Sequence, residues 1–414
     1  MDLTRKASIW LLLSTMFLTS LGFGVILPTL PFLSKHLGAT PLQMGLAISV
    51  FSVASLFASF LWGAASDRLG RRPVLIMGIV GYGLSSALLA LAPNITVLLI
   101  LRFLAGVMAS AVSPSSMALV TELTSAEERP QILGYMGSIN GIGFIFGPPV
   151  GAFLSIFGIG VPFVSVGLLS ILNGLLAMRF LPRGSKLEEV SSEAFRREEN
   201  KGNAWVAGVK RLGLLLKNKM IAPLLFGSFV IALADASISS TLSYFITGPL
   251  QSTQTMAGWA FMMNAGVSAI AQATIFARIF TRYGDMMTIV IGFSFGAVGF
   301  FLLGLSQLLV WAFGAVALLS LCRGLAFPSI TTGISLRISS ALQGSGFGSY
   351  NTVGSLGRTL GPLIAGWLFS LHASSPFFFS GGLLLLTVGA FLIWTYREKK
   401  MSAHQQSNTV QKTV

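Results

Sequence analysis

One acidic residue of this sequence lies apart from all the others. The chain of 414 residues has 13 Asp and Glu residues, and twelve of them fall in connectors, at the ends of apolar stretches or in the termini. Asp235 alone lies deep within a long apolar stretch. A carboxylate in a bilayer costs about 2.5–3.5 kcal/mol or more unless it is paired, hydrated or protonated. Asp235 is therefore a candidate for loading and releasing protons, or for attracting a cationic ligand.

Three arginines, Arg102, Arg323 and Arg358, also fall inside apolar stretches. At a rise of ~1.5 Å per residue, Arg323 and Asp235 each lie about 22 Å into stretches that are entered from opposite sides. A purely structural ion pair between these two residues is therefore a second interpretation of the acid. Arg102 could in the same way be an isolated cation buried against helix carbonyls.

The stretches that hold these residues are long enough to cross a membrane. Hydrophobic residues make up 53% of the chain and charged residues only 10%, which excludes a water-soluble fold of this length. We expect an all-α membrane protein with twelve transmembrane helices, because stretches of about 20 apolar residues recur along the whole chain. The predicted spans are 8–30, 42–64, 73–92, 96–120, 131–154, 161–182, 221–246, 254–280, 287–306, 308–336, 344–370 and 376–397.

One connector differs from the rest and divides the spans into two groups of six. It is dense in Glu, Arg and Lys, and it carries a candidate interfacial helix over 204–216, in which apolar residues recur at helical spacing. We therefore predict four parts. They are a six-helix bundle over 1–182, a cytoplasmic linker over 183–219, a second six-helix bundle over 220–397 and a cytoplasmic tail over 398–414.

The basic residues predict which side each connector faces. The net charge is +14, with 27 Lys and Arg residues. If both termini are cytoplasmic, only Lys35 lies in an outward loop and three arginines lie in spans, which leaves 23 (27 − 1 − 3) on the cytoplasmic side. This distribution obeys the positive-inside rule, so the basic excess reports orientation and not a nucleic acid partner. The first apolar stretch is expected to be an uncleaved span.

The two halves of the chain repeat one another at a constant offset in residue number, 214 (284 − 70). The repeated residues are mainly glycines and prolines, as in Gly70 and Gly284, Gly78 and Gly292, Gly143 and Gly357, and Pro148 and Pro362. Parallel repeats of this kind suit a transporter whose site lies between two bundles that rock to open on either side. Apart from Arg68 and Arg282, the ionisable residues compared are not repeated, since Asp235 corresponds to Leu21 and Arg102 to Val316.

Several segments resemble the major facilitator superfamily, and in particular its branch of 12-span drug:proton antiporters, which includes bacterial multidrug and tetracycline exporters. The segments are Gly63-Ala-Ala-Ser-Asp67-Arg68-Leu-Gly70-Arg71-Arg72-Pro73 between spans 2 and 3, Leu101-Arg102-Phe-Leu-Ala-Gly106 in span 4, and Gly143-Phe-Ile-Phe-Gly147-Pro148-Pro149-Val-Gly151 in span 5. Span 1 resembles the same branch over Leu21-Gly22-Phe23-Gly24-Val-Ile-Leu-Pro28-Thr-Leu-Pro31. The resemblance implies the major facilitator fold and a role for Arg102 in proton coupling.

The first motif implies a conformational latch at the cytoplasmic face. Gly63 allows spans 2 and 11 to approach, and Asp67 then faces the start of span 11, where free N–H groups stabilise an anion. The resemblance implies that a charge network extends this latch, and its residues are Gly63, Asp67, Arg68, Gly70, Arg71 and Glu122. The alternative is that the basic loop only fixes topology. Arg358 is a possible partner of the latch or a packing residue.

The span 5 motif places small residues on one helix face. Its members Gly143, Gly147, Pro148 and Gly151 would form a small-residue surface and a bend, which could be a dry face at the bundle interface that resists proton leak. Ordinary packing is the alternative.

Candidate residues for the substrate cavity are large or polar, although most such residues in a membrane bundle face lipid or neighbouring helices. They are Phe23, Met108, Asn140, Tyr244, Trp259 and Met263.

These features predict a secondary active transporter of a bacterial plasma membrane, a proton-coupled antiporter that exports amphipathic drugs or related compounds by alternating access. The alternative is export or import of one metabolite class, such as a sugar, an amino acid or a lipid-like compound, on the same fold. We expect no enzyme activity, no catalytic residues, and no cofactor other than the proton gradient as energy source. One cysteine and three scattered histidines predict no metal site. The expected partners are lipid, protons and a small amphipathic substrate, with the monomer as the functional unit.

Overall fold

The computed structural model describes residues 3–125, 128–181, 213, 215, 217–218, 220–337 and 343–411. The regular structure within these ranges is helical, without strands. Nearly all of the predicted interfacial helix, like nearly all of the predicted linker, lies outside the described residues. The prediction of an all-α membrane protein is confirmed.

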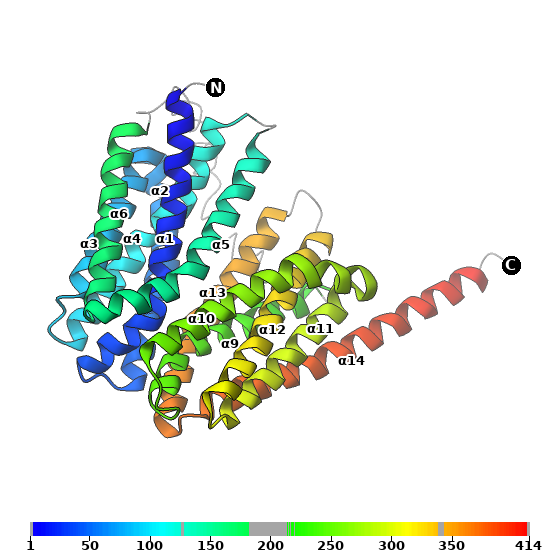
Figure 1. Ribbon diagram of the computed structural model, residues 1–414. Helices are drawn as coiled ribbons and strands as arrows, with labels where there is room; N and C mark the ends of the chain where they lie inside the picture. The colour runs from blue at the N-terminus through cyan, green and yellow to red at the C-terminus, as the bar shows by residue number, and fades with distance from the viewer. Residues whose placement is uncertain are drawn as a thin grey trace. The chain divides into compact units, whose positions relative to one another are not determined.

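The first half of the chain consists of six long helices (Figure 1). They are α1 (Leu3–His36), α2 (Pro41–Leu69), α3 (Arg71–Leu89), α4 (Ile95–Leu123), α5 (Arg129–Leu154) and α6 (Val161–Phe180), with a short 3-10 turn at Ser155–Phe157. Side chains fix two of the helix starts. Thr40 and Gln43 form a reciprocal capping box at α2, and the Asn94 side chain accepts a hydrogen bond from Val97 N at α4.

The second half repeats this pattern with one continuous helical run. Its helices are α9 (Ala222–Thr247), α10 (Gln254–Ile270), α11 (Phe276–Leu305), α12 (Leu309–Arg337), α13 (Gln343–Leu371) and α14 (Ser375–Gln411), and a π-helical turn at Ala271–Ile275 joins α10 to α11. The backbone leaves helical geometry at Gly284, between the predicted spans 254–280 and 287–306. Helix α14 continues beyond its predicted span into the segment that we predict as a tail.

Ten helices or helical runs in the described part are long and apolar enough to cross a membrane. One of them, Gln254–Leu305, has 52 residues. At ~1.5 Å per residue its contour is about 78 Å, which is enough for two crossings separated by the break at Gly284. Helix α13 is not among the ten, because Arg358 and several glycines and serines dilute its apolar residues. The count of twelve spans stays a prediction.

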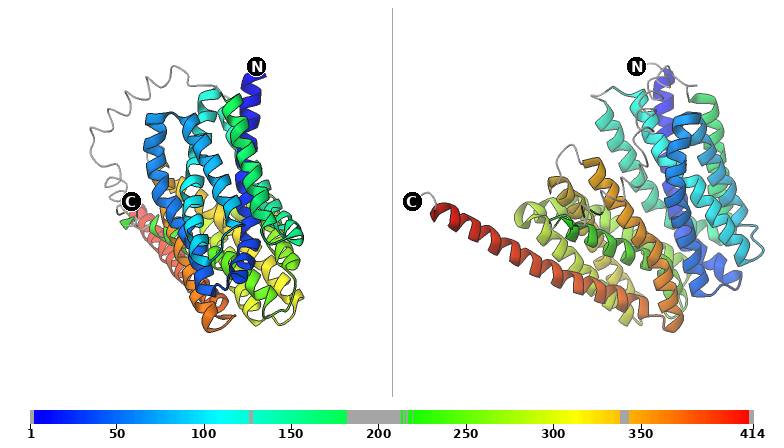
Figure 2. Two further views of the ribbon diagram at one scale, coloured as in Figure 1. Left: turned by 90° about the vertical axis from the view of Figure 1, so that its left-hand side faces the viewer. Right: turned by 180° about the vertical axis from the view of Figure 1, so that it is seen from behind.

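The described helices group into two units. The first unit contains α1–α6 together with Ala236–Ala265 and Arg358–Ala373, and the second contains α9 up to Asp235, Gly266–Gly357 and the chain from Ser374. In the first unit α1 packs against α5 and α6, α3 against α4 and α6, and α2 against α4. These six helices run lengthwise beside one another in both views of Figure 2. In the second unit α11 packs against α12 and α14.

The backbone confirms the internal repeat. Gly70, between α2 and α3, has φ 88°, and Gly284, its counterpart in the second half, has φ 77°. Both residues adopt the left-handed region that glycine accepts without strain, so the same tight turn recurs in each half. Gly78 packs closely against α4 near Met108 O, and Gly292 packs against α12 near Cys322 O, at the same offset.

The repeat contains a small shift that the sequence comparison did not detect. Gly143 approaches Phe17 O on α1 at 2.6 Å, measured from an added Cβ, and Gly357 approaches Phe229 O on α9 at the same distance. The numbers of the two glycines differ by 214 (357 − 143), but those of the two carbonyls differ by 212 (229 − 17), so α9 matches α1 at the smaller offset. The structural counterpart of Asp235 is therefore Phe23, and the correspondence with Leu21 that an ungapped comparison predicts is wrong.

Candidate functional site

Asp235, the acid that lies within an apolar helix, forms an ion pair in the second unit. Arg323 on α12 donates a hydrogen bond through Nη1 to Asp235 Oδ1 on α9 at 3.2 Å. The two side chains keep 34% and 38% of their surface exposed, respectively. The carboxylate of Asp235 therefore has a cation partner and is still partly exposed. An ion pair of this kind depends on the charge of both partners, and neutralising either one would break it.

Arg102 lies in a different environment. It is only 2% exposed on α4, seven positions after the first residue of that helix, Ile95. Its Nε donates to Ala47 O on α2 at 3.1 Å, and its Cζ lies 4.5 Å above the centroid of the Phe51 ring. Its Nη1 is buried and has no hydrogen-bond partner among the described residues. Arg102 is therefore a buried cation held by one carbonyl and one aromatic face.

A row of aromatic rings extends from this arginine across the first unit. The ring of Phe51 on α2 lies 5.9 Å from that of Phe23 on α1, and Phe23 lies 6.1 Å from Phe144 on α5, measured between centroids. All three side chains are partly buried. Sequence reasoning named Phe23 and Arg102 but missed Phe51 and Phe144, because nothing in their spacing distinguishes them from the other phenylalanines.

The small-residue face of α5 is filled by α1. A Cβ added at Gly147 would lie 2.6 Å from Gly24 Cα, and one added at Gly151 would lie 2.7 Å from Val25 O. On α5 the neighbouring residues Pro148 and Ala152 contact Gly258 of α10, within the same unit. The glycines therefore make a close contact inside the first bundle. This geometry explains them by packing, which is the simpler of the two interpretations, and the proton-leak role stays a prediction.

The predicted latch is only partly within the described side chains. The side chains of Asp67, Arg68 and Glu122, and the surroundings of Gly63, lie outside them. Gly70 ends α2 in its left-handed turn, and Arg71 then donates through Nη1 to Ala118 O on α4 at 3.2 Å. The latch stays a prediction.

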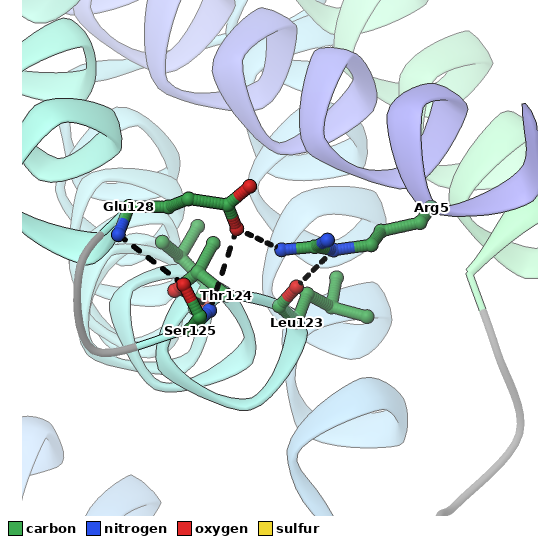
Figure 3. A network of polar contacts seen from close by, with 6 residues as sticks. Arg5, Leu123, Thr124, Ser125 and Glu128 are labelled. Atoms are coloured by element: carbon green, nitrogen blue, oxygen red, sulfur yellow. Dashed lines mark hydrogen bonds and ion pairs between the residues drawn. The ribbon is translucent and has the colours of Figure 1, made fainter. Parts of the chain in front are cut away.

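A polar network ties together the ends of three helices (Figure 3). Arg5 on α1 donates to Leu123 O at the end of α4 and forms an ion pair with Glu128, which precedes α5. Ser125 and Glu128 cap one another's backbone N–H groups. The hydrogen bond from Arg5 holds the pKa of Glu128 below its ordinary value. The network thus satisfies free groups at two helix ends with one cation and one anion.

The second unit has its own ion pair at a helix end, which sequence reasoning also missed. Both terminal nitrogens of Arg337 on α12 donate to Asp285 on α11, and Nη1 also donates to Gly333 O. The side chains are 19% and 14% exposed, respectively. Asp285 corresponds to Arg71 at the offset of 214 (285 − 71). The repeat therefore places opposite charges at equivalent positions, but it does not relate Asp285 to Arg337.

Helices α2 and α13 approach closely inside the first unit. Gly45 contacts the carbonyl of Pro362, an added Cβ at Gly366 would lie 2.6 Å from Pro41 O, and Ser49 Oγ donates to Thr359 O at 2.7 Å. By the predicted topology these residues belong to the outer ends of spans 2 and 11. In that topology, the outer ends of α2 and α13 are in contact.

The remaining predicted site residues do not gather in one place. Met108 packs its side chain against Gly81 of α3, and the Tyr244 ring lies 6.0 Å from that of Phe369. Asn140 and Trp259 are exposed. Met263 is partly buried and Arg358 is exposed on α13. Within the described ranges no group of three or more His, Cys, Asp and Glu is placed to hold a metal ion.

Known proteins resemble this chain over nearly its whole length. It is 26% identical to multidrug resistance protein 2 of Bacillus subtilis (strain 168), covering 96% of this chain and 97% of the relative. It is 25% identical to the quinolone resistance protein NorA of Staphylococcus aureus (strain MSSA476), covering 95% and 98%. The fold matches the crystal structure of the nucleoside transporter NupG with a TM-score of 0.75, at 17% identity and with 94% and 99% of the chains covered.

The sequence model of one family matches the chain twice, over residues 12–227 and 224–412. The family is the one that the motifs in spans 2, 4 and 5 resemble. This protein belongs to the Major Facilitator Superfamily, and it is a multi-pass membrane transporter.

Proposed function

We propose that this transporter is a proton-coupled antiporter that exports amphipathic compounds. The observation that carries the proposal is the ion pair between Asp235 and Arg323, in which a reachable carboxyl lies within an apolar helix. An intramembrane acid with a fixed cation partner has two stable states, one ionised and paired, the other protonated and neutral. Exchange between these states can drive a change in how α9 and α12 pack.

The proposed cycle has two steps at this pair. A proton from outside the cell neutralises Asp235, and the free energy that stabilised its ion pair with Arg323 is lost. The transporter then changes conformation and releases the proton to the cytoplasm, while the substrate moves the other way. Arg102 supplies a fixed positive charge in the first bundle, and the resemblance to drug:proton antiporters assigns it to the coupling machinery.

The names of the relatives support export of drugs. One relative is a multidrug resistance protein and another is a quinolone resistance protein, and both match almost the full chain. The proposal includes a bacterial plasma membrane, both termini on the cytoplasmic side, the proton gradient as energy source and a functional monomer.

Inverted membrane vesicles energised by respiration test the proposal. A pH-sensitive dye records the gradient while candidate compounds are added. Many unrelated amphipathic compounds should each collapse part of the gradient, and vesicles without the protein should give no response. A response to one class of sugar or metabolite alone would instead indicate a specific transporter. No response to any compound would refute proton-coupled export.

A further inference from the structure

The charges within the predicted spans do not balance. Among the described residues deep in these spans, Asp235 is the one acid, against Arg102, Arg323 and Arg358. Arg323 already compensates Asp235. The first bundle therefore holds a buried cation for which its described residues supply no acid at this depth.

Arg102 also has more hydrogen-bond donors than the described residues use. A guanidinium has five N–H donors. One of them, on Nε, is bonded to Ala47 O, whereas Nη1 is fully buried and has no partner in the described part of the chain. An unused donor on a buried cation is costly, and a carboxylate would satisfy two donors at once with charge-assisted bonds.

A second polar side chain lies beside this arginine. Tyr82 on α3 is 2% exposed, and its hydroxyl is near enough to interact electrostatically with the guanidinium. The hydroxyl is buried and its polar neighbour is the Ser86 side chain, although these two hydroxyls do not meet strict hydrogen-bond geometry. It can donate to the same anion. Tyr82 on α3 and Arg102 on α4 are thus electrostatic neighbours inside the first unit.

The other side of the guanidinium is aromatic. Phe51 lies over it, and Phe23 and Phe144 continue the row away from it toward α5. These rings are partly buried, so the row is a surface on which a flat aromatic body can lie.

We propose that Arg102 and Tyr82 bind the carboxylate of an aromatic amphipathic substrate, whose ring system lies on the row Phe51, Phe23 and Phe144. The inference rests on the proposed function and names its substrate class, namely aromatic compounds with a carboxylate, anionic or zwitterionic. The bound carboxylate supplies the counter-charge for the buried cation of the first bundle.

Two dyes that differ in one group test this assignment. Rhodamine B carries a free carboxylate, and its ethyl ester carries the same ring system without that charge. Binding of each dye to the purified protein in nanodiscs is measured by fluorescence polarisation, and the readout is the ratio of the two affinities. Arg102→Gln should lower the preference for the acid by about tenfold or more, because charge-assisted hydrogen bonds are lost. Tyr82→Phe should lower it several-fold.

Two controls separate binding from folding. Binding of the ester shows that each variant is folded, and Arg358→Gln, which removes a different arginine from a span, should keep the wild-type ratio. An unchanged ratio in both Arg102→Gln and Tyr82→Phe would overturn the inference. So would an equal loss of both dyes in a variant whose melting temperature is unchanged.

A transport assay distinguishes failure of this inference from failure of the proposed function. Proton movement is recorded in proteoliposomes while each dye is added. Movement with the acid far above that with the ester is the expected result. Equal movement with both dyes would overturn the substrate class and leave the antiporter proposal standing. No movement with any amphipathic compound would refute the antiporter, and the nanodisc ratio would still decide whether Arg102 binds a carboxylate.

Discussion

Replacing Gly147 with alanine tests the contact between α5 and α1 that the span 5 motif creates. The added Cβ would lie 2.6 Å from Gly24 Cα and 2.7 Å from Leu21 O. Ordinary contacts begin at 3.4 Å, so the two helices must separate locally by about 0.8 Å (3.4 − 2.6). Both of these atoms belong to the backbone of α1, so no side chain can rotate to make room.

The magnitude follows from two opposing contributions. Overpacking of a tight interior costs about 1–3 kcal/mol. Alanine gains about 1 kcal/mol over glycine inside a helix. Gly141 lies on the same helix, is exposed and has open space around its Cβ position. Because Gly141→Ala gains the helix propensity without the clash, the two variants should differ by about 1–3 kcal/mol.

Thermal unfolding of the purified variants, followed by intrinsic tryptophan fluorescence, measures this difference. Gly147→Ala should melt several degrees below Gly141→Ala, and Gly141→Ala should melt at or above the wild type. Equal melting temperatures would refute the contact between α5 and α1. Proton leak into liposomes without substrate gives a second readout. If Gly147→Ala raises this leak and Gly141→Ala does not, the face has the sealing role that the motif predicts in addition to its packing role.

Three further predictions concern helix ends. Gly45→Ala should push apart the outer ends of α2 and α13, so spin-label distances between these ends should lengthen relative to the wild type. Because the hydrogen bond from Arg5 lowers the pKa of Glu128, the stabilisation is present above the unfolded value of about 4.3 and is lost as the pH falls through the lower folded value. The melting temperature of Glu128→Gln should therefore lie below that of the wild type at neutral pH, and the difference should disappear under acid conditions. Removing one partner of the ion pair between Asp285 and Arg337 should destabilise the folded protein by about 3–5 kcal/mol, because it leaves a buried charge unpaired. The double variant Asp285→Leu with Arg337→Met should be less destabilised than either single variant. Melting curves of the wild type, both single variants and the double variant measure this difference.

The elements and the intramembrane ion pair could be predicted because they depend on local quantities. Span length follows from the thickness of a bilayer, and the turn at Gly70 and Gly284 follows from a spacing that both halves share. The depths of Asp235 and Arg323 follow from the rise per residue along their helices. These arguments need no knowledge of which helices are neighbours.

The surroundings of Arg102 could not be predicted, because they depend on how helices pack. Phe51, Tyr82 and Ala47 come from two helices that reach Arg102 only in the folded bundle. The chain has 32 phenylalanines, and sequence spacing does not single out Phe51.

The shift of two residues between α1 and α9 could not be predicted for a different reason. A comparison without gaps cannot detect extra residues in one half. Between α9 and α11 the second half contains a π-helical turn, which accommodates one of the two extra residues (214 − 212).

The central claim is that Asp235 couples proton movement to export, and one measurement tests it most directly. Purified wild type and Asp235→Asn are reconstituted in liposomes, a pH gradient is imposed, and the accumulation of a transported amphipathic dye is followed. The wild type should accumulate the dye against its gradient only while the pH gradient lasts. Asp235→Asn should lose this accumulation but still exchange dye across the membrane when no pH gradient is present. Accumulation by Asp235→Asn equal to that of the wild type would contradict the claim.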